Sequence, residues 1–192
     1  MAAPADDPVR AAFAATPRRW FLPGDQQQFA DLDRPLPIGN GQTNSQPSTV
    51  EEMLRILDVR PGQRVLDVGC GSGWTTALLA HLVGPTGSVL GVEIVAELVA
   101  QGRANLTAAD RPWAGIRPAV PGVLGLPDDG PFDRILVSAE ASTLPQVLVD
   151  QLRVGGVMVV PVAGWMVRAV RRDAGVDTER LGAYSFVPLI GG

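Results

Sequence analysis

The feature that most limits the fold of this chain is the alternation of short apolar runs with helical patterns. Apolar runs at residues 64–68, 88–92 and 132–138 predict buried strands, and residues 74–83 and 96–106 between them predict helices. A strand, a helix and a second strand in this order form the βαβ unit of a parallel sheet. We therefore expect a doubly wound, Rossmann-like α/β fold with helices on both faces of the sheet.

The remainder of the C-terminal half is expected to complete this sheet. A short strand is predicted near Ile116, a helix at residues 144–152 and a strand at 157–160. Residues 165–170 and 184–190 predict two more strands, which we interpret as a hairpin. The sheet should then be mostly parallel, with an antiparallel edge.

The N-terminal part has less regular patterning. Residues 7–15 predict a short helix, and residues 23–47 form a long segment rich in Gly, Pro, Gln and Asn without clear periodicity. A loop of this length in a compact domain is often functional. A second helix should follow over residues 50–57, where Ser48 and Glu51 have the spacing of a capping box.

Composition is typical of a single folded domain. The chain has 192 residues, of which 46% are hydrophobic and 19% charged, so it can fold without disulfides or a structural metal. We expect one domain over residues 1–192. Its residues 1–60 would carry the N-terminal helices and the long loop, and residues 61–192 would form the core that binds a ligand.

Charge and cysteine content restrict the partners and the compartment. The net charge is −4 and the sixteen basic residues, all arginine, form no cluster, which argues against nucleic acid as a partner. No apolar stretch approaches the ~18 residues of a membrane span. The lone Cys70 cannot pair within the chain, and Asp6 and Asp7 stand where a secretory signal would be apolar. These features predict a cytoplasmic protein.

The sharpest motif is Val65-Leu66-Asp67-Val68-Gly69-Cys70-Gly71-Ser72-Gly73, where a strand passes into a helix. Glycines there let a ligand lie against bare backbone. Trp74 occupies the position that would complete a dinucleotide fingerprint, and its bulk argues against a close pyrophosphate. Glu93 ends the next strand, where an acid can accept hydrogen bonds from both ribose hydroxyls. An adenosine ligand without a pyrophosphate fits best.

This pattern resembles the S-adenosylmethionine site of class I methyltransferases. The resemblance implies S-adenosylmethionine as cofactor, bound by Asp67, Gly69, Cys70, Gly71, Gly73 and Glu93. The competing interpretation is a glycine-rich turn in an unrelated α/β domain. Cys70 has no His nearby in sequence, so we interpret it as a small filler residue and not as a nucleophile.

A second motif lies in the long loop, at Leu36-Pro37-Ile38-Gly39-Asn40-Gly41-Gln42-Thr43-Asn44-Ser45-Gln46-Pro47. It resembles the L-P-I-G-x-G-Q-T-I-S-Q-P signature of protein L-isoaspartate O-methyltransferases and differs mainly at Asn44. The resemblance continues over nearly the whole chain, at residues 14–18, 21, 33–34, 131–133, 145, 151–152, 155–156, 160–162 and 186–189.

By this resemblance Ser45 is the active-site serine, while Gln42 and Thr43 contact the cofactor. The implied activity is methylation of a carboxylate at isoaspartyl or aspartyl residues of a peptide or protein. A carboxylate is already ionised at neutral pH and needs no general base. A hydroxyl such as that of Ser45 or Thr43 can aim the carboxylate with one hydrogen bond. Either hydroxyl could instead only stabilise the loop.

Two further departures from the family pattern affect the predicted site. Where the family has a G-D-G segment whose Asp meets the adenine amino group, this chain has Val120-Pro121-Gly122. Loss of that partner should weaken cofactor binding by ~1–3 kcal/mol. Glu140 replaces a neutral residue after the fourth strand and is expected at the edge of the substrate cleft, where it would oppose an anion. It could instead pair with an arginine of the substrate or of this chain, or be a solvated loop acid.

Several functions therefore stay open. The leading hypothesis is a carboxyl methyltransferase, acting on isoaspartate generally or on one dedicated peptide. A degenerate domain that binds S-adenosylmethionine weakly and serves as an interaction module is favoured by the lost adenine acid, and opposed by Ser45, Glu93 and the three glycines. A methyltransferase for a small metabolite or a nucleic acid is the third possibility. The sequence does not indicate the oligomeric state.

Overall fold

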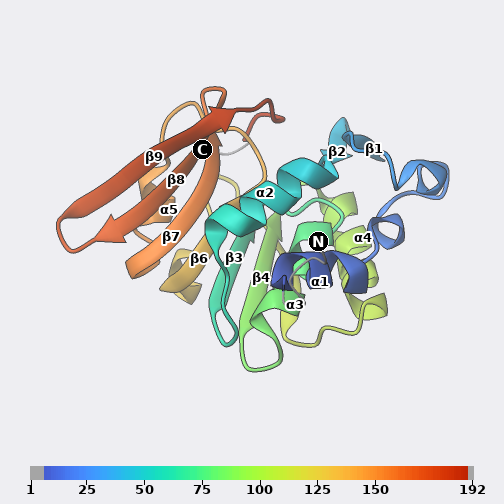
Figure 1. Cartoon of the computed structure of the whole chain (residues 1–192), viewed down its shortest axis with the longest axis horizontal. Helices are drawn as coiled ribbons and strands as arrows, with labels where there is room; N and C mark the ends of the chain where they lie inside the picture. The colour runs from blue at the N-terminus through green and yellow to red at the C-terminus, as the bar shows by residue number, and fades with distance from the viewer. Residues whose placement is uncertain (1–6, 190–192) are drawn as a thin grey trace, which may run out of the picture.

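A seven-stranded sheet runs through the centre of the computed structural model, which describes residues 7–189 (Figure 1). In spatial order its strands are β5 (Ala114–Pro118), β4 (Ser88–Glu93), β3 (Arg64–Val68), β6 (Phe132–Val137), β7 (Leu152–Val162), β8 (Trp165–Arg172) and β9 (Gly175–Ala183). The first five are parallel, while β8 and β9 are antiparallel to their neighbours. The mostly parallel sheet with an antiparallel edge is confirmed.

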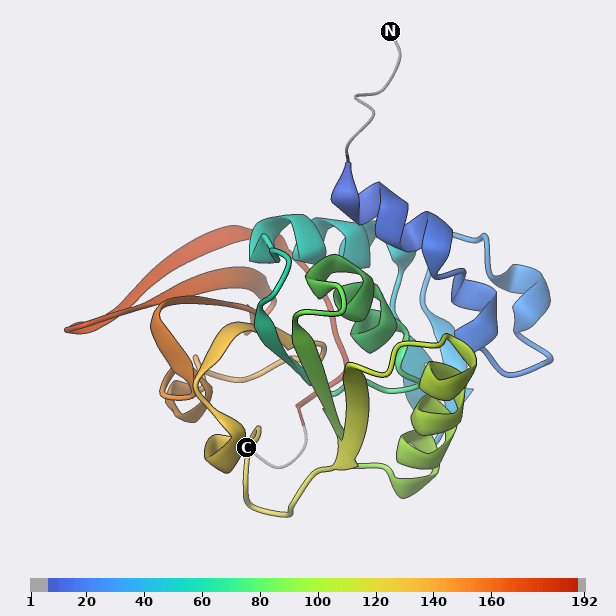
Figure 2. The ribbon, with the colours of Figure 1, turned by 90° about the horizontal axis from the view of Figure 1, so that it is seen from below.

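Helices cover both faces of the sheet, as predicted (Figure 2). Alternate strand residues face opposite sides, so Val65 joins the core under the N-terminal helices and Leu66 joins the core under the other face. The first face carries α1 (Pro8–Ala15), α2 (Pro47–Leu57), α3 (Trp74–Val83) and α4 (Ala96–Ala108), and the second carries α5 (Gln146–Val149). Short 3-10 helices are η1 (Arg18–Phe21), η2 (Gln27–Phe29) and η3 (Pro127–Asp129).

The strand order creates a crevice at the carboxyl edge of the sheet. From β3 the chain passes through α3 to β4 and through α4 to β5, and then returns to place β6 on the other side of β3. The loops that follow β3 and β6 therefore leave the sheet in opposite directions. In open α/β sheets, ligands bind outside the carboxyl ends of the strands at such a reversal of order.

The N-terminal segment is more ordered than its sequence suggested. The expected loop contains a hairpin of β1 (Leu36–Gly39) and β2 (Gln42–Asn44). The prediction that Ser48 and Glu51 form a capping box is wrong. Helix α2 begins at Pro47, whose fixed φ suits the first helical position. Asp33 accepts the backbone N–H of Ser48 at 2.9 Å, and Glu51 binds Arg55 instead.

Two predictions for the C-terminal part are wrong. The helix expected at residues 144–152 has only the four residues of α5, because β7 already begins at Leu152. The partner of β8 is β9 and not residues 184–190, of which Ile190 lies outside the described part of the chain. Strand β9 is mostly exposed and polar, so it lacks the apolar signal of a buried strand. Between residues 7 and 189, no helix is long and apolar enough to cross a membrane.

Candidate active site

The loop between β3 and α3 forms the floor of the site. Gly71 and Gly73 have left-handed backbone conformations, with φ of 53° and 88°. A Cβ at Gly71 would lie 3.1 Å from Ile38 Cδ1, and one at Gly73 would lie 3.0 Å from Ile116 Cδ1. Gly71 thus lets the β1–β2 hairpin approach the loop, and Gly73 allows close packing against β5.

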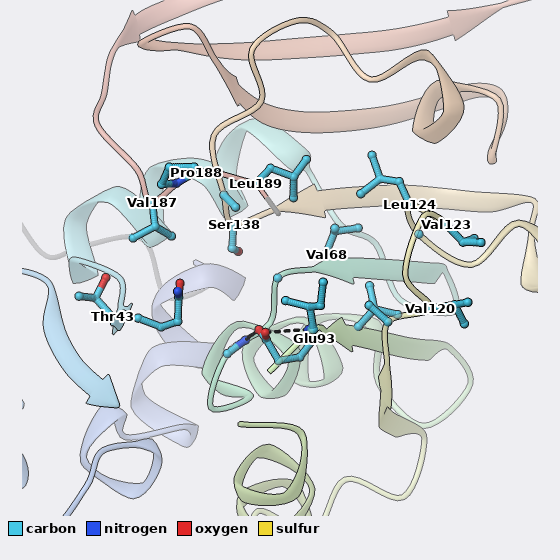
Figure 3. A pocket seen from close by; sticks show the side chains of 18 of the residues that line it. Thr43, Val68, Glu93, Val120, Val123, Leu124, Ser138, Val187, Pro188 and Leu189 are labelled. Atoms are coloured by element: carbon cyan, nitrogen blue, oxygen red, sulfur yellow. Dashed lines mark hydrogen bonds between the residues drawn. The ribbon is translucent and has the colours of Figure 1, made fainter. Parts of the chain in front are cut away.

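Glu93 holds this loop from the end of β4. One carboxylate oxygen accepts the N–H of Gly71 at 2.9 Å, as Figure 3 marks, and the other accepts those of Ile94 and Val95 at 2.8 and 2.9 Å. A carboxylate offers about four acceptor positions, so these bonds leave room for a ligand hydroxyl. The predicted proximity of Glu93 to the glycine loop is present in the structure.

Asp67 and Cys70 lie beneath the loop. Asp67 is fully buried, and one of its oxygens accepts the hydroxyls of Thr75 and Thr76 at 2.6 and 2.7 Å. Burial raises the pKa of Asp67 to about 6, although the two hydroxyls oppose the change. Burial, with the nearby charges of Asp67 and Glu93, also raises the pKa of the Cys70 thiol well above its ordinary range. Such a thiol is a poor nucleophile.

The main cleft lies above the glycine loop and encloses about 740 Å³ that is partly open to solvent. Figure 3 shows Glu93 between an apolar end with Val120 and Val123 and a polar end with Thr43. The C-terminal segment borders the cleft through Val187, Pro188 and Leu189. Of the predicted cofactor residues, those that line this cleft are Gln42, Thr43, Gly69, Gly71 and Glu93. Asp67, Cys70 and Gly73 do not line it: Cys70 lines an adjoining pocket, Asp67 accepts hydrogen bonds from Thr75 and Thr76 beneath the loop, and Gly73 allows close packing.

Ser45 lies beside the main cleft, in two adjoining pockets. One of these contains Cys70 and Trp74, and the other opens towards Phe186. Thr43 and Ser138 line the main cleft and both pockets, so the three spaces meet at these residues. The structure therefore brings Ser45 next to the glycine loop, as the sequence predicted.

Arg18 fixes the segment that carries Ser45. Its buried guanidinium donates to both oxygens of Asn44, at 2.7 and 2.9 Å, and to the Ser45 carbonyl at 2.8 Å. Other bonds reach the carbonyls of residues 30, 32 and 34. The guanidinium also lies over the Trp74 ring, 5.5 Å from its centroid. Asn44, the departure from the family signature, is thus explained as the buried partner of Arg18.

Residues that the sequence did not assign to the site include Ser138 and the segment 187–189. The segment is held to the loop after β6, because the N–H of Glu140 donates to Val187 O and the N–H of Leu189 donates to Glu140 O, both at 2.8 Å. The side chain of Glu140 lines neither the cleft nor the two adjoining pockets. The expectation that its charge opposes the substrate is therefore unsupported.

The charges around the cleft favour a cationic ligand. Glu93 lines it and Asp67 lies below it, whereas no arginine between residues 7 and 189 lines the cleft or the two pockets beside it. Within that same range, no group of three or more His, Cys, Asp or Glu is placed to hold a metal ion. The polar donors are hydroxyls, an amide and backbone groups.

Fold and site together define a Rossmann-like methyltransferase domain with a cleft at the switch in strand order. The sequence model of protein-L-isoaspartate(D-aspartate) O-methyltransferases matches residues 3–192. The chain belongs to this family.

Individual relatives agree with this assignment. The chain is 43% identical to a protein-L-isoaspartate O-methyltransferase of Methanopyrus kandleri, over 95% of this chain and 83% of that protein. It is 42% identical to the protein of the same name from Methanothrix thermoacetophila, over 95% of this chain and 88% of that protein. A structure of this kind from Plasmodium falciparum, in complex with S-adenosyl-L-homocysteine, superposes with a TM-score of 0.85 at 26% identity, over 98% of this chain and 93% of that one.

Proposed function

We propose that this protein is an enzyme that transfers a methyl group from S-adenosylmethionine to the carboxylate of isoaspartyl residues in peptides or proteins. The observation that carries the proposal is that the main cleft and the two pockets of Ser45 share Thr43 and Ser138, so the cleft that contains Glu93 adjoins the space beside Ser45. The names of the relatives and the S-adenosyl-L-homocysteine in the Plasmodium structure support it.

The residues of the cleft suit this cofactor. Glu93 is 6% exposed and keeps acceptor capacity for a ribose hydroxyl, while Val120 and Val123 offer apolar contact to a base. When bound, S-adenosylmethionine supplies a methyl group attached to a positively charged sulfur. The bond from this methyl group to sulfur breaks as its new bond to the carboxylate oxygen forms. The acidic groups beneath the loop and the absence of lining arginine accommodate that positive charge.

The work of the protein is orientation. The free carboxylate of an isoaspartyl residue is an α-carboxylate with a pKa of about 3.3–3.7, so it is ionised at neutral pH and no general base is needed. Ser45 can donate its hydroxyl hydrogen to one carboxylate oxygen and leave a lone pair of the attacking oxygen free. Arg18 holds the Ser45 carbonyl, and the glycine loop and the C-terminal segment border the junction, so fixed parts of the chain orient the accepting carboxylate.

The substrate range and the compartment are finer parts of this proposal. We infer that the acceptor is an isoaspartyl residue, as the names of the family and of the relatives state. We also infer that nucleic acid is not a substrate, because the lining of the cleft carries no arginine for phosphate. A cytoplasmic location fits the single, buried Cys70.

The decisive experiment measures transfer of labelled methyl groups to an isoaspartyl peptide and to its aspartyl twin. We expect a clear preference for the isoaspartyl peptide, and Ser45→Ala should lower turnover while the affinity for S-adenosyl-L-homocysteine stays nearly constant. Ser48→Ala, at an exposed position outside the cleft, is the matched control. Equal transfer to both peptides would refute isoaspartate specificity, and no calorimetric binding of S-adenosyl-L-homocysteine would refute the enzyme assignment.

A further inference from the structure

The Ser138 hydroxyl is buried without a partner. Its oxygen is inaccessible to solvent and makes no hydrogen bond with any described group of the protein. Burying a hydroxyl without a hydrogen bond is unfavourable, and the great majority of buried side-chain polar atoms have a partner. Because this oxygen belongs to a residue that lines the cleft, a bound ligand is the natural partner.

Ser138 stands at a rigid position next to the reaction point. It directly follows β6, and its N–H donates to Val68 O at 2.9 Å, which ties it to the end of β3. Gly69, the first residue of the glycine loop, lies beside its backbone. Figure 3 shows the side chain directed into the space between Thr43 and Glu93. Ser138 thus lies at the junction where the cofactor cleft meets the Ser45 pockets, and rotation about its Cα–Cβ bond would bring the covered hydroxyl to a ligand there.

The chemistry of the substrate calls for a second donor at this junction. A carboxylate has two oxygens, and one hydrogen bond from Ser45 leaves the group free to rotate about the line of that bond. No arginine between residues 7 and 189 lines this site to supply a two-pronged contact. A neutral hydroxyl orients the carboxylate and, unlike an arginine, does not reduce its charge.

We propose that Ser138 donates its hydroxyl hydrogen to the substrate carboxylate, as the second donor beside Ser45. This inference rests on the proposed function, since it names a further substrate contact of the same site. Two donors, one directly after β6 and one in the segment after β2, restrict the orientation of the carboxylate. The attacking oxygen then points along the cleft towards the methyl group.

The test compares Ser138→Ala with Ser138→Thr. The matched control is Ser88→Ala, which removes a hydroxyl at the start of β4, at the end of the sheet away from the cleft. For Ser138→Ala we expect kcat/KM for an isoaspartyl peptide to fall at least about tenfold, as for loss of one hydrogen bond to a charged group. The affinity for S-adenosyl-L-homocysteine should change less than about twofold, and the midpoint of thermal unfolding should not fall. Ser138→Thr keeps the hydroxyl and should retain most of the activity.

A binding measurement separates this inference from the proposed function. The fluorescence anisotropy of a labelled isoaspartyl peptide is titrated with protein saturated with S-adenosyl-L-homocysteine. Weaker peptide binding by Ser138→Ala with unchanged cofactor affinity supports the inference. Unchanged peptide binding and turnover, or a loss confined to cofactor affinity, overturns it while the proposed function stands. If the unmodified protein methylates no isoaspartyl peptide, the proposed function fails and this inference fails with it.

Discussion

Arg18 links stability and activity in this protein, so Arg18→Met is the most informative single substitution. The variant keeps much of the apolar stem but removes the buried guanidinium, which donates to Asn44 Oδ1 at 2.7 Å, Asn44 O at 2.9 Å and Ser45 O at 2.8 Å. Burial lowers the pKa of Arg18 to about 10, which leaves it protonated at neutral pH. The segment before Ser45 would lose its only charged anchor among the described contacts.

The magnitude follows from the acceptors that would be left without a donor. Both oxygens of Asn44 are on a buried residue, while the carbonyls of the more exposed loop can be rehydrated. A buried acceptor without a donor costs about 1–3 kcal/mol. Two such acceptors predict a loss of about 2–6 kcal/mol in the free energy of unfolding. Displacement of Ser45 should also lower kcat/KM for the peptide by about 10- to 100-fold in the folded variant.

Urea unfolding followed by far-UV circular dichroism measures the first effect, and methyl transfer to an isoaspartyl peptide measures the second. The matched control is Arg19→Met, whose side chain is exposed and next in sequence, and it should change the free energy of unfolding by less than about 0.5 kcal/mol. If Arg18→Met unfolds within about 1 kcal/mol of the unmodified protein and keeps its turnover, the assignment of Arg18 as the anchor of Ser45 is wrong.

Three further substitutions test the floor and the ends of the cleft. Asp67 has a pKa of about 6 in the folded protein against an ordinary 3.8, so the cost of ionising it is absent below the lower value and complete above the higher one. The advantage of Asp67→Asn in unfolding free energy should therefore grow by about 2 kcal/mol between about pH 4.5 and pH 7.5, and a constant difference would contradict the burial argument. Gly73→Ala should lower the free energy of unfolding by about 2–4 kcal/mol, because its Cβ would crowd Ile116 and its backbone conformation would be strained. The control is Gly155→Ala, at a position with a similar φ but open space around the added Cβ, which should lower the free energy of unfolding by about 1–2 kcal/mol. If urea unfolding gives equal losses for the two variants, crowding at Gly73 makes no contribution. Pro121→Asp should raise calorimetric affinity for S-adenosyl-L-homocysteine about 5- to 100-fold by offering an acceptor to the adenine amino group, and no gain would show that the base lies elsewhere.

The central sheet could be predicted because its buried strands and helices carry strong apolar patterns with clear ends. Strand β3 and helix α3 have the predicted bounds, and α3 is apolar on nearly all sides because it is buried on nearly all sides. Strand β9 escaped prediction since an exposed edge strand needs few apolar residues. The β1–β2 hairpin was missed because its strands are short and one contains Pro37.

The candidate site was predictable only where it depends on neighbouring strands. Glu93 ends the strand beside β3, so its approach to Gly71 follows from the βαβ order. The role of Arg18 depends on contacts with residues 12 to 27 positions away, which no local pattern encodes. The significance of Ser138 depends on an absence, the missing partner of its hydroxyl, and that is visible only once every nearby group has been placed.

The distribution of charge suggests how binding and release are linked in this cleft. The lining of the described site has an acid, Glu93, and neutral donors, but no arginine, so its own side chains provide no positive charge to attract an anionic carboxylate. Transfer of the methyl group removes the positive charge of the cofactor's sulfonium together with the negative charge of the carboxylate. We therefore expect the peptide to bind more tightly to the complex with S-adenosylmethionine, or with a charged analogue that cannot react, than to the complex with neutral S-adenosyl-L-homocysteine. A low-dielectric cleft strengthens this preference, and the same loss of charge favours release of the methyl ester.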